Sequence, residues 1–146
     1  MQNTDLAGKW TYRSFRNNPE PVDGNLDKLG RLLFAEAEFT FEITGDALKG
    51  VIDWGSNGLD LTGTIHPAAG DAPLALEMVG LGRANPPPPD PASTTGWEYD
   101  YYAYAAHAWP TGVNQVPALV GTVIRAKPHG GAPAGYVASF IAVRKG

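Results

Sequence analysis

The sequence predicts an all-β protein, a single domain over residues 1–146 in which eight antiparallel strands close into an up-and-down barrel. Apolar and polar residues alternate in short stretches along the chain, a period typical of half-buried strands. The 18 Gly and 13 Pro disfavour long helices, since Gly costs roughly 1 kcal/mol and Pro roughly 3 at a helix-interior site. No long crossover separates the stretches, so a meander is the simplest connection. A two-sheet sandwich is the alternative.

The strands follow from the alternation, taken in order. Residues 9–16 place Trp10 and Tyr12 on one face, and residues 36–43 place Phe39 and Phe41 opposite a row of charged residues. The remaining strands are expected at residues 48–54, 59–66, 74–83, 97–107, 118–126 and 135–145.

The connections predict which end of the barrel is open. Residues 17–28, 84–96 and 127–134 are rich in Gly and Pro and form long loops. All three fall after odd-numbered strands, so they share one end of a meander, and we expect the mouth there. The loop over residues 84–96, with its proline run at 86–89, is expected to form a rim or a lid. Residues 29–37 are ambiguous and are taken as a helical turn that leads into the second strand.

Composition argues against several classes of function. The net charge of −4 carries no basic bias, so no nucleic acid is expected as a partner. No apolar run approaches the roughly 20 residues of a membrane helix. There is no Cys, and the three His are scattered without ligand spacing, so neither a metal nor another cofactor is expected. The N-terminus has no recognisable signal peptide, which favours a cytoplasmic location.

One end-to-end pattern resembles a known group. Gly8 and Trp10 open the first strand as Gly-x-Trp, and Arg144 lies on the last strand, where it can cover the Trp10 ring if the two strands pair. This pattern resembles the calycin superfamily, which includes lipocalins, fatty-acid-binding proteins and avidins. The resemblance implies a barrel that binds an apolar small molecule. The four Trp, with Trp109 among them, do not match the ligand-facing pattern of avidins, so biotin is not implied.

The candidate ligand-binding residues are the aromatic and apolar residues expected to point into the barrel. Trp54, Trp97, Tyr99 and Tyr136 are expected near the mouth, and Phe39, Phe41, Met78, Tyr101 and Phe140 deeper. The alternative is that these side chains only fill the core of a small barrel and bind no ligand. Arg83 and Arg125 end strands at the mouth and could meet an anionic group, although solvation at the surface is the preferred interpretation.

The segment 97–104 carries the candidate catalytic residues. Tyr99 and Tyr101 face inward if Trp97 does; in the opposite parity Glu98 and Asp100 would face inward as a carboxylate pair, one a general acid or base. The first parity is preferred because it gives the better core. It leaves Tyr102 and Tyr104 outside, as an aromatic pair suited to a homodimer contact.

Three functions remain open from the sequence. The first is a barrel that binds a small, largely apolar, aromatic or polycyclic molecule. The second is a cofactor-independent isomerase or cyclase that uses the same pocket. The third is a barrel with a filled core that acts through its surface, as an oligomerisation or interaction module.

Overall fold

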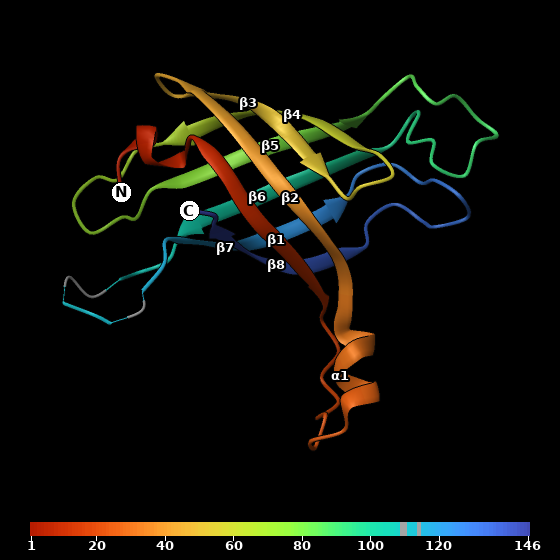
Figure 1. Ribbon diagram of the computed structural model, residues 1–146, viewed down its shortest axis with the longest axis horizontal. Coiled ribbons are helices and arrows are strands. Elements are labelled where there is room, and N and C mark those ends of the chain that lie inside the picture. The colour runs from red at the N-terminus through yellow and green to blue at the C-terminus, as the bar shows by residue number, and fades with distance from the viewer. Residues whose placement is uncertain (109–110, 114) are drawn as a thin grey trace.

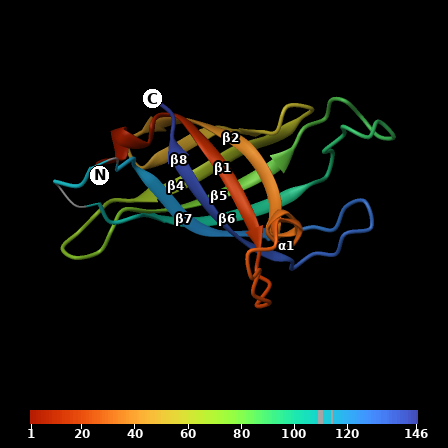
Figure 2. The same cartoon turned by 60° about the horizontal axis from the view of Figure 1, so that its bottom comes forward.

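The computed structural model describes residues 1–108, 111–113 and 115–146, and its regular structure is almost entirely β. Its antiparallel strands pair in sequence order, and the last pairs with the first, which closes a barrel (Figures 1 and 2). The predicted fold class is therefore confirmed, and the two-sheet sandwich is excluded. The elements are η1 (Asn3–Leu6, a 3₁₀ helix), β1 (Gly8–Arg16), α1 (Leu26–Leu32), β2 (Leu33–Thr44), β3 (Ala47–Asp53), β4 (Gly58–His66), β5 (Ala75–Gly82), β6 (Glu98–Ala105), β7 (Ala118–Arg125) and β8 (Val137–Arg144).

The helix α1 begins earlier than the sequence predicted. Residues 26–28 were expected in a loop, but the side chain of Asn25 accepts hydrogen bonds from the backbone N–H of Asp27 at 2.9 Å and of Lys28 at 3.1 Å. This N-cap satisfies donors that the first turn leaves free, so the helix starts at Leu26. None of its residues is buried, and Figure 1 shows α1 projecting away from the barrel.

The alternation of the strands fills the barrel with apolar side chains. Trp10, Phe39 and Phe140 are at most 1% exposed, and Phe39 packs on Phe41 with ring centroids 4.9 Å apart. Burial of such residues stabilises the fold by roughly 25 cal/mol per Å² of apolar surface. The middle of the barrel and its closed end are therefore a packed core.

Two interior glycines allow neighbouring strands to approach closely. A Cβ atom at Gly50 would lie 2.0 Å from the carbonyl oxygen of Thr40, and one at Gly121 would lie 1.8 Å from that of Tyr102. Any other residue would clash with backbone at these positions. Glycine within a strand typically marks such a close approach of backbone.

The seam between β1 and β8 holds the closed end together. Trp10 pairs with Arg144 in the strand register, and the Arg144 guanidinium carbon lies 5.8 Å from the centre of the Trp10 ring. The indole N–H of Trp10 donates to the carbonyl of Leu6 at 2.9 Å, and Arg144 donates to the carbonyl of Asp5. These contacts join η1, β1 and β8. Both chain termini lie at this end (Figure 1).

The long loops after β5 and β7 lie together at the opposite end of the barrel (Figure 1). The loop over residues 83–97 includes the proline run, and the loop over residues 126–136 folds back on itself through a bridge between His129 and Ala132. The short turn between β3 and β4 belongs to the same end, since the strands alternate in direction. This arrangement agrees with the mouth that the loop lengths predicted.

Candidate functional site

A cavity of about 320 Å³ opens at the mouth of the barrel. Its wall is mostly aromatic and aliphatic, and it comes from strands and from both neighbouring loops. The lining residues are Tyr12, Phe34, Ala35, Ala37, Ile52, Trp54, Leu59, Trp97, Tyr99, Tyr101, Val123, Arg125 and His129.

Two other hollows of the described residues differ in character. One of about 960 Å³ lies at the closed end among loop residues, many of them Ala, Gly or Pro. The other, of about 380 Å³, lies on the outer face over β4–β6 and includes Asp100. Of these three hollows among the described residues, the mouth cavity is the one that combines apolar aromatic walls with a few polar groups inside the barrel, which is the usual composition of a small-molecule site.

Stacked rings form one wall of the mouth cavity. Trp54, just after β3, stacks on Trp97 with centroids 5.9 Å apart and planes 23° apart. Trp97 also stacks on His129, with centroids 3.7 Å apart and planes 12° apart. Three segments that are distant in the sequence thus meet in one aromatic surface. Such a surface suits a flat, unsaturated ligand because rings favour offset stacking.

A chain of hydrogen bonds crosses the polar side of the cavity. The Arg125 Nε donates to the Tyr99 hydroxyl at 3.0 Å, and that hydroxyl lies 2.8 Å from the Nε2 atom of His129. Burial, with a further contribution from the positive charge of Arg125, lowers the pKa of His129 below 6.5. The ring is therefore neutral at pH 7, and its Nε2 can accept the Tyr99 proton while the Tyr99 oxygen accepts from Arg125.

Arg125 is a charged group in the wall of this cavity. It is 8% exposed, and within the described part of the chain no carboxylate forms an ion pair with it. Its guanidinium carbon lies 5.3–5.9 Å from the ring centres of Phe34, Tyr99 and Tyr136. Surface solvation was therefore the wrong interpretation for Arg125, because it overlooked that the inward face of β7 ends at this residue.

Tyr12 and Tyr101 form the floor of the cavity. Their rings lie 6.2 Å apart and pack on Phe39 and Phe140 below. Burial raises the pKa of both phenols, so both are neutral at pH 7. The Tyr101 hydroxyl makes no hydrogen bond to a described residue, so it is free to bind a polar group of a ligand.

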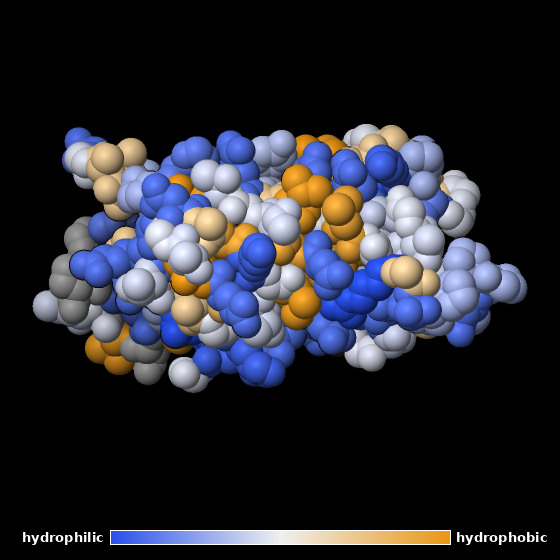
Figure 3. Space-filling view, turned by 90° about the horizontal axis from the view of Figure 1, so that it is seen from above, coloured by the Kyte–Doolittle hydropathy of each residue, from blue (hydrophilic) through white to orange (hydrophobic). Residues whose placement is uncertain are grey.

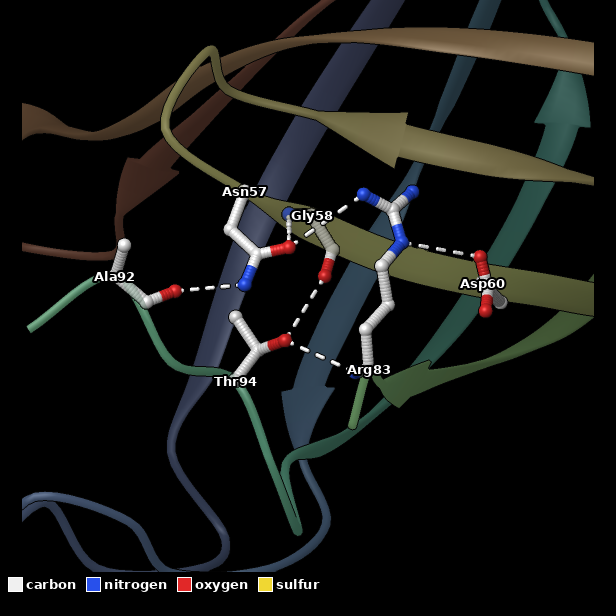
Figure 4. Close-up of polar contacts among 6 residues, drawn as sticks. All are labelled: Asn57, Gly58, Asp60, Arg83, Ala92 and Thr94. Carbon is white, nitrogen blue, oxygen red and sulfur yellow. Dashed lines mark hydrogen bonds and ion pairs between the residues drawn. The ribbon is translucent and has the colours of Figure 1, made fainter. Parts of the chain in front are cut away.

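Polar contacts fix the proline-rich loop to the mouth (Figure 4). The Asn57 side chain donates to the carbonyl of Ala92 at 2.7 Å. The hydroxyl of Thr94, which is 1% exposed, donates to the carbonyl of Gly58 at 3.1 Å and accepts from the N–H of Arg83 at 3.0 Å. The loop is thus an anchored wall that positions Trp97, which matches the predicted rim.

The structure divides the candidate ligand-binding residues into two groups. Trp54, Trp97, Tyr99 and Tyr101 line the cavity. Tyr136 lies beside it, with its ring 5.3 Å from the Arg125 guanidinium carbon. Residues of the second group are at most 2% exposed and belong to the packed core, away from the cavity wall: Phe39, Phe41, Met78 and Phe140.

The carboxylates considered as catalytic groups lie on the outer face. Glu98 forms an ion pair with Lys127 at 3.6 Å, and Asp100 borders the outer hollow. Tyr102 and Tyr104 are also on this face and are 45% and 49% exposed. Between Glu98 and Tyr104 the strand therefore has the preferred parity, and the inward carboxylate pair is excluded.

Sequence reasoning did not single out His129 and Phe34 as residues of the site, nor these other lining residues: Tyr12, Ala35, Ala37, Ile52, Leu59 and Val123. His129 was expected only as part of the loop over residues 127–134, and Phe34 as part of the ambiguous stretch over residues 29–37. A signal existed for Ala35 and Ala37, because they continue the alternation of β2 back from Phe39. Phe34 has the opposite parity and lines the cavity at the shift of register opposite Ser14 and Phe15. His129 carries no such signal, since the path of its loop depends on stacking against Trp97.

Comparisons with protein families, curated proteins and solved structures find no match to this chain. Fold and site together define a closed eight-stranded barrel with an aromatic pocket at one end. Trp109 lies outside the described residues. Within the described ranges, no three His, Cys, Asp or Glu side chains are grouped to hold a metal ion. No helix among them is long and apolar enough to span a membrane.

Proposed function

We propose that this protein is a calycin-like barrel that binds one small, largely apolar aromatic or polycyclic molecule in its mouth. The observation that carries the proposal is the cavity of about 320 Å³, whose wall includes the stacked Trp54 and Trp97. Its volume falls within the range of small-molecule sites, near the lower limit. The seam formed by Gly8, Trp10 and Arg144 supports the calycin assignment.

The chemistry of the wall supports a ligand with flat apolar surface. Each Å² of apolar surface removed from water contributes roughly 25 cal/mol, and stacking on Trp97 adds to this. The cavity ends at Tyr12 and Tyr101, below which the core is packed. The proposed ligand is therefore short enough to remain between the mouth and the rings of Tyr12 and Tyr101.

Native mass spectrometry tests this proposal. The protein is purified gently, and its native mass is compared with its denatured mass; a non-covalent adduct of a few hundred daltons is expected. If the protein is bare, polycyclic dyes are titrated while Trp fluorescence is recorded, and quenching is expected because Trp54 and Trp97 line the cavity. Saturable quenching that persists in Trp54→Leu with Trp97→Leu would contradict a site in the mouth.

The second candidate function is a cofactor-independent isomerase or cyclase. It is favoured by the Tyr99 hydroxyl, which lies between the charge of Arg125 and the acceptor Nε2 of His129. Such a phenol can exchange a proton with a bound substrate while Arg125 stabilises developing negative charge. In Tyr99→Phe an enzyme would lose turnover and keep most of its binding, whereas a carrier would lose only modest affinity.

A surface function through self-association is a further proposal. Tyr102 and Tyr104 expose aromatic rings on the outside of β6, and neighbouring β5 exposes Val79 and Leu81. Figure 3 shows one face of the molecule, where some apolar side chains are exposed among hydrophilic ones. We expect a homodimer that Tyr102→Lys with Tyr104→Lys dissociates. A monomeric mass for the wild type at millimolar concentration would contradict it.

The cytoplasmic location stays a prediction from the sequence.

A further inference from the structure

We propose that the molecule bound in the mouth is an aromatic carboxylate whose carboxylate group binds Arg125. This inference rests on the proposed binding function and adds the chemical class of the ligand. It depends on the cavity, on the burial of Arg125 and on the hydrogen bonds that its guanidinium leaves open.

Within the described ranges, the charge of Arg125 lacks the carboxylate partner that Arg13 and Arg83 have. Arg13 forms an ion pair with Glu36 at 2.8 Å and Arg83 with Asp60 at 3.2 Å, both at the surface. Arg125 is the more buried group, yet it contacts ring faces and neutral oxygens among the described residues. Burial of an uncompensated charge is costly. A bound anion would supply the missing negative charge.

The hydrogen bonds of Arg125 leave part of its guanidinium open to a ligand. Its Nε donates to Tyr99 and its Nη1 donates to the carbonyl of Pro133 at 3.1 Å. These two contacts hold the guanidinium plane in place. The Nη2 group makes no hydrogen bond to a described residue, and Nη1 keeps a second hydrogen. Together they present the end of the guanidinium, a fork that matches the two oxygens of a carboxylate.

A carboxylate suits this cavity better than a phosphate ester does. Arg125 is the only Lys or Arg among the described residues that line the cavity, and the remaining wall is mainly apolar. One guanidinium balances the single charge of a carboxylate, whereas a dianionic phosphate would keep a buried negative charge. The stacked Trp54, Trp97 and His129 would contact the ring system that bears the acid.

The test compares two probes that have the same shape and differ in charge. We would measure the affinities of 2-naphthoate and 2-naphthamide for the wild-type protein by isothermal titration calorimetry at pH 7.5. We expect 2-naphthoate to bind at least about tenfold more tightly, because a hydrogen-bonded charge pair replaces a neutral contact. This comparison needs no variant, so it does not depend on how a substitution affects folding.

A substitution then assigns the effect to Arg125. In Arg125→Gln, 2-naphthoate is expected to lose about tenfold in affinity or more, and 2-naphthamide to change by less than about threefold. Arg16→Gln is the matched control, because Arg16 lies 5.5 Å from the same Phe34 ring but is exposed and outside the cavity wall. It should leave both affinities unchanged.

The outcomes separate this inference from the proposed function. Equal affinities for the two probes, with both displaced by a polycyclic dye, would overturn the carboxylate inference and leave the binding function intact. No binding of either probe or of any dye to folded protein would overturn both. A preference for 2-naphthoate that Arg125→Gln retains and Arg16→Gln removes would also overturn the assignment to Arg125.

Discussion

At the scale of single residues, the polar side chains on the two faces of β6 differ in whether they have hydrogen-bond partners. Inside, Tyr99 connects Arg125 and His129 and so takes part in the candidate site. Outside, Asp100 has one buried carboxylate oxygen without a hydrogen-bond partner among the described residues. In the first arrangement the Tyr99 hydroxyl has a hydrogen-bond partner on each side, whereas in the second a carboxylate oxygen has none in the described part of the chain. Both make predictions about the pH dependence of stability.

Asp100→Asn is expected to stabilise the fold at neutral pH. Burial, with a smaller contribution from Glu98, raises the pKa of Asp100 above 3.8. A raised folded-state pKa in an acid favours folding below the unfolded pKa, and this stabilisation is lost as the pH rises through the folded pKa. The group is partly exposed, so a gain of a few tenths of a kcal/mol to about 1 kcal/mol is expected at pH 7.

Urea unfolding at pH 7 and pH 3 measures the effect of this substitution. The stabilisation should be present at pH 7 and vanish near pH 3, where the wild-type Asp100 is protonated in both states. Glu77→Gln, on the neighbouring strand and exposed, is the control and should have little effect at either pH. A loss of stability in Asp100→Asn at pH 7 would show that the carboxylate has a partner that it needs.

His129 should make the fold less stable as the pH falls. Its pKa is lowered below 6.5 in the folded state, so the unfolded chain binds a proton at a higher pH than the folded chain does. The resulting stability is present above pH 6.5 and is lost as the pH falls from there through the lowered folded pKa. The advantage of the wild type over His129→Gln should therefore shrink from pH 7.5 to pH 5.5, measured by urea unfolding. A constant difference would contradict this.

At the scale of elements, the loop over residues 83–97 shows how an irregular segment can become a fixed wall. The Thr94 hydroxyl bonds two backbone groups: it donates to the carbonyl of Gly58 and accepts from the N–H of Arg83. Asn57 adds a third contact at Ala92. Because the loop ends at Trp97, these contacts also place one of the two indole rings of the cavity.

Thr94→Val should loosen this wall. The substitution keeps the shape of the side chain and removes the hydroxyl, so the carbonyl of Gly58 and the N–H of Arg83 lose a buried partner. A cost of about 1–3 kcal/mol in the free energy of unfolding is expected. Thr62→Val, at an exposed position on β4, should change it by less than about 0.5 kcal/mol.

Hydrogen exchange of the backbone amides gives the second measurement of this element. Residues 83–97 should exchange faster in Thr94→Val than in the wild type, while the strands keep their order of protection. Affinity for an aromatic probe should fall as well, since Trp97 would be less well placed. Unchanged protection of the loop would mean that its prolines and Asn57 are sufficient to hold it.

The elements also show what the sequence could predict. Alternation located every strand to within a few residues, because a side-chain period of two fixes which face is buried. It also placed Tyr99 and Tyr101 inside. It could not place His129, whose loop is positioned by contacts with Trp97. It placed Arg125 at the mouth but not within the wall, since the burial of a strand end depends on the loops that fold over it.

At the scale of the whole molecule, the barrel has a separation of roles between its two ends. The mouth carries the cavity, and the seam of Trp10 and Arg144 closes the other end. Every strand pairs on both sides, so no strand can detach without breaking contacts to two neighbours. We therefore expect the barrel to unfold as one cooperative unit.

Trp10→Ala should reduce global stability without altering the site. Trp10 is fully buried, and truncation of a buried aromatic residue costs about 3–5 kcal/mol. Arg144→Gln should cost less, about 0.5–2 kcal/mol, because it removes a cation over a ring and a hydrogen bond near the surface. Urea unfolding followed by far-UV circular dichroism and by Trp fluorescence should give coincident transitions in both variants.

The affinity of the folded protein for 2-naphthoate shows whether Arg144 has a structural role alone or also contributes to ligand binding. It should be unchanged within about twofold in Arg144→Gln, because Arg144 does not line the mouth cavity. Non-coincident transitions in Trp10→Ala would mean that the closed end unfolds apart from the mouth. The barrel would then consist of two units, and ligand binding would stabilise only the half that contains Arg125, through its preference for the folded state.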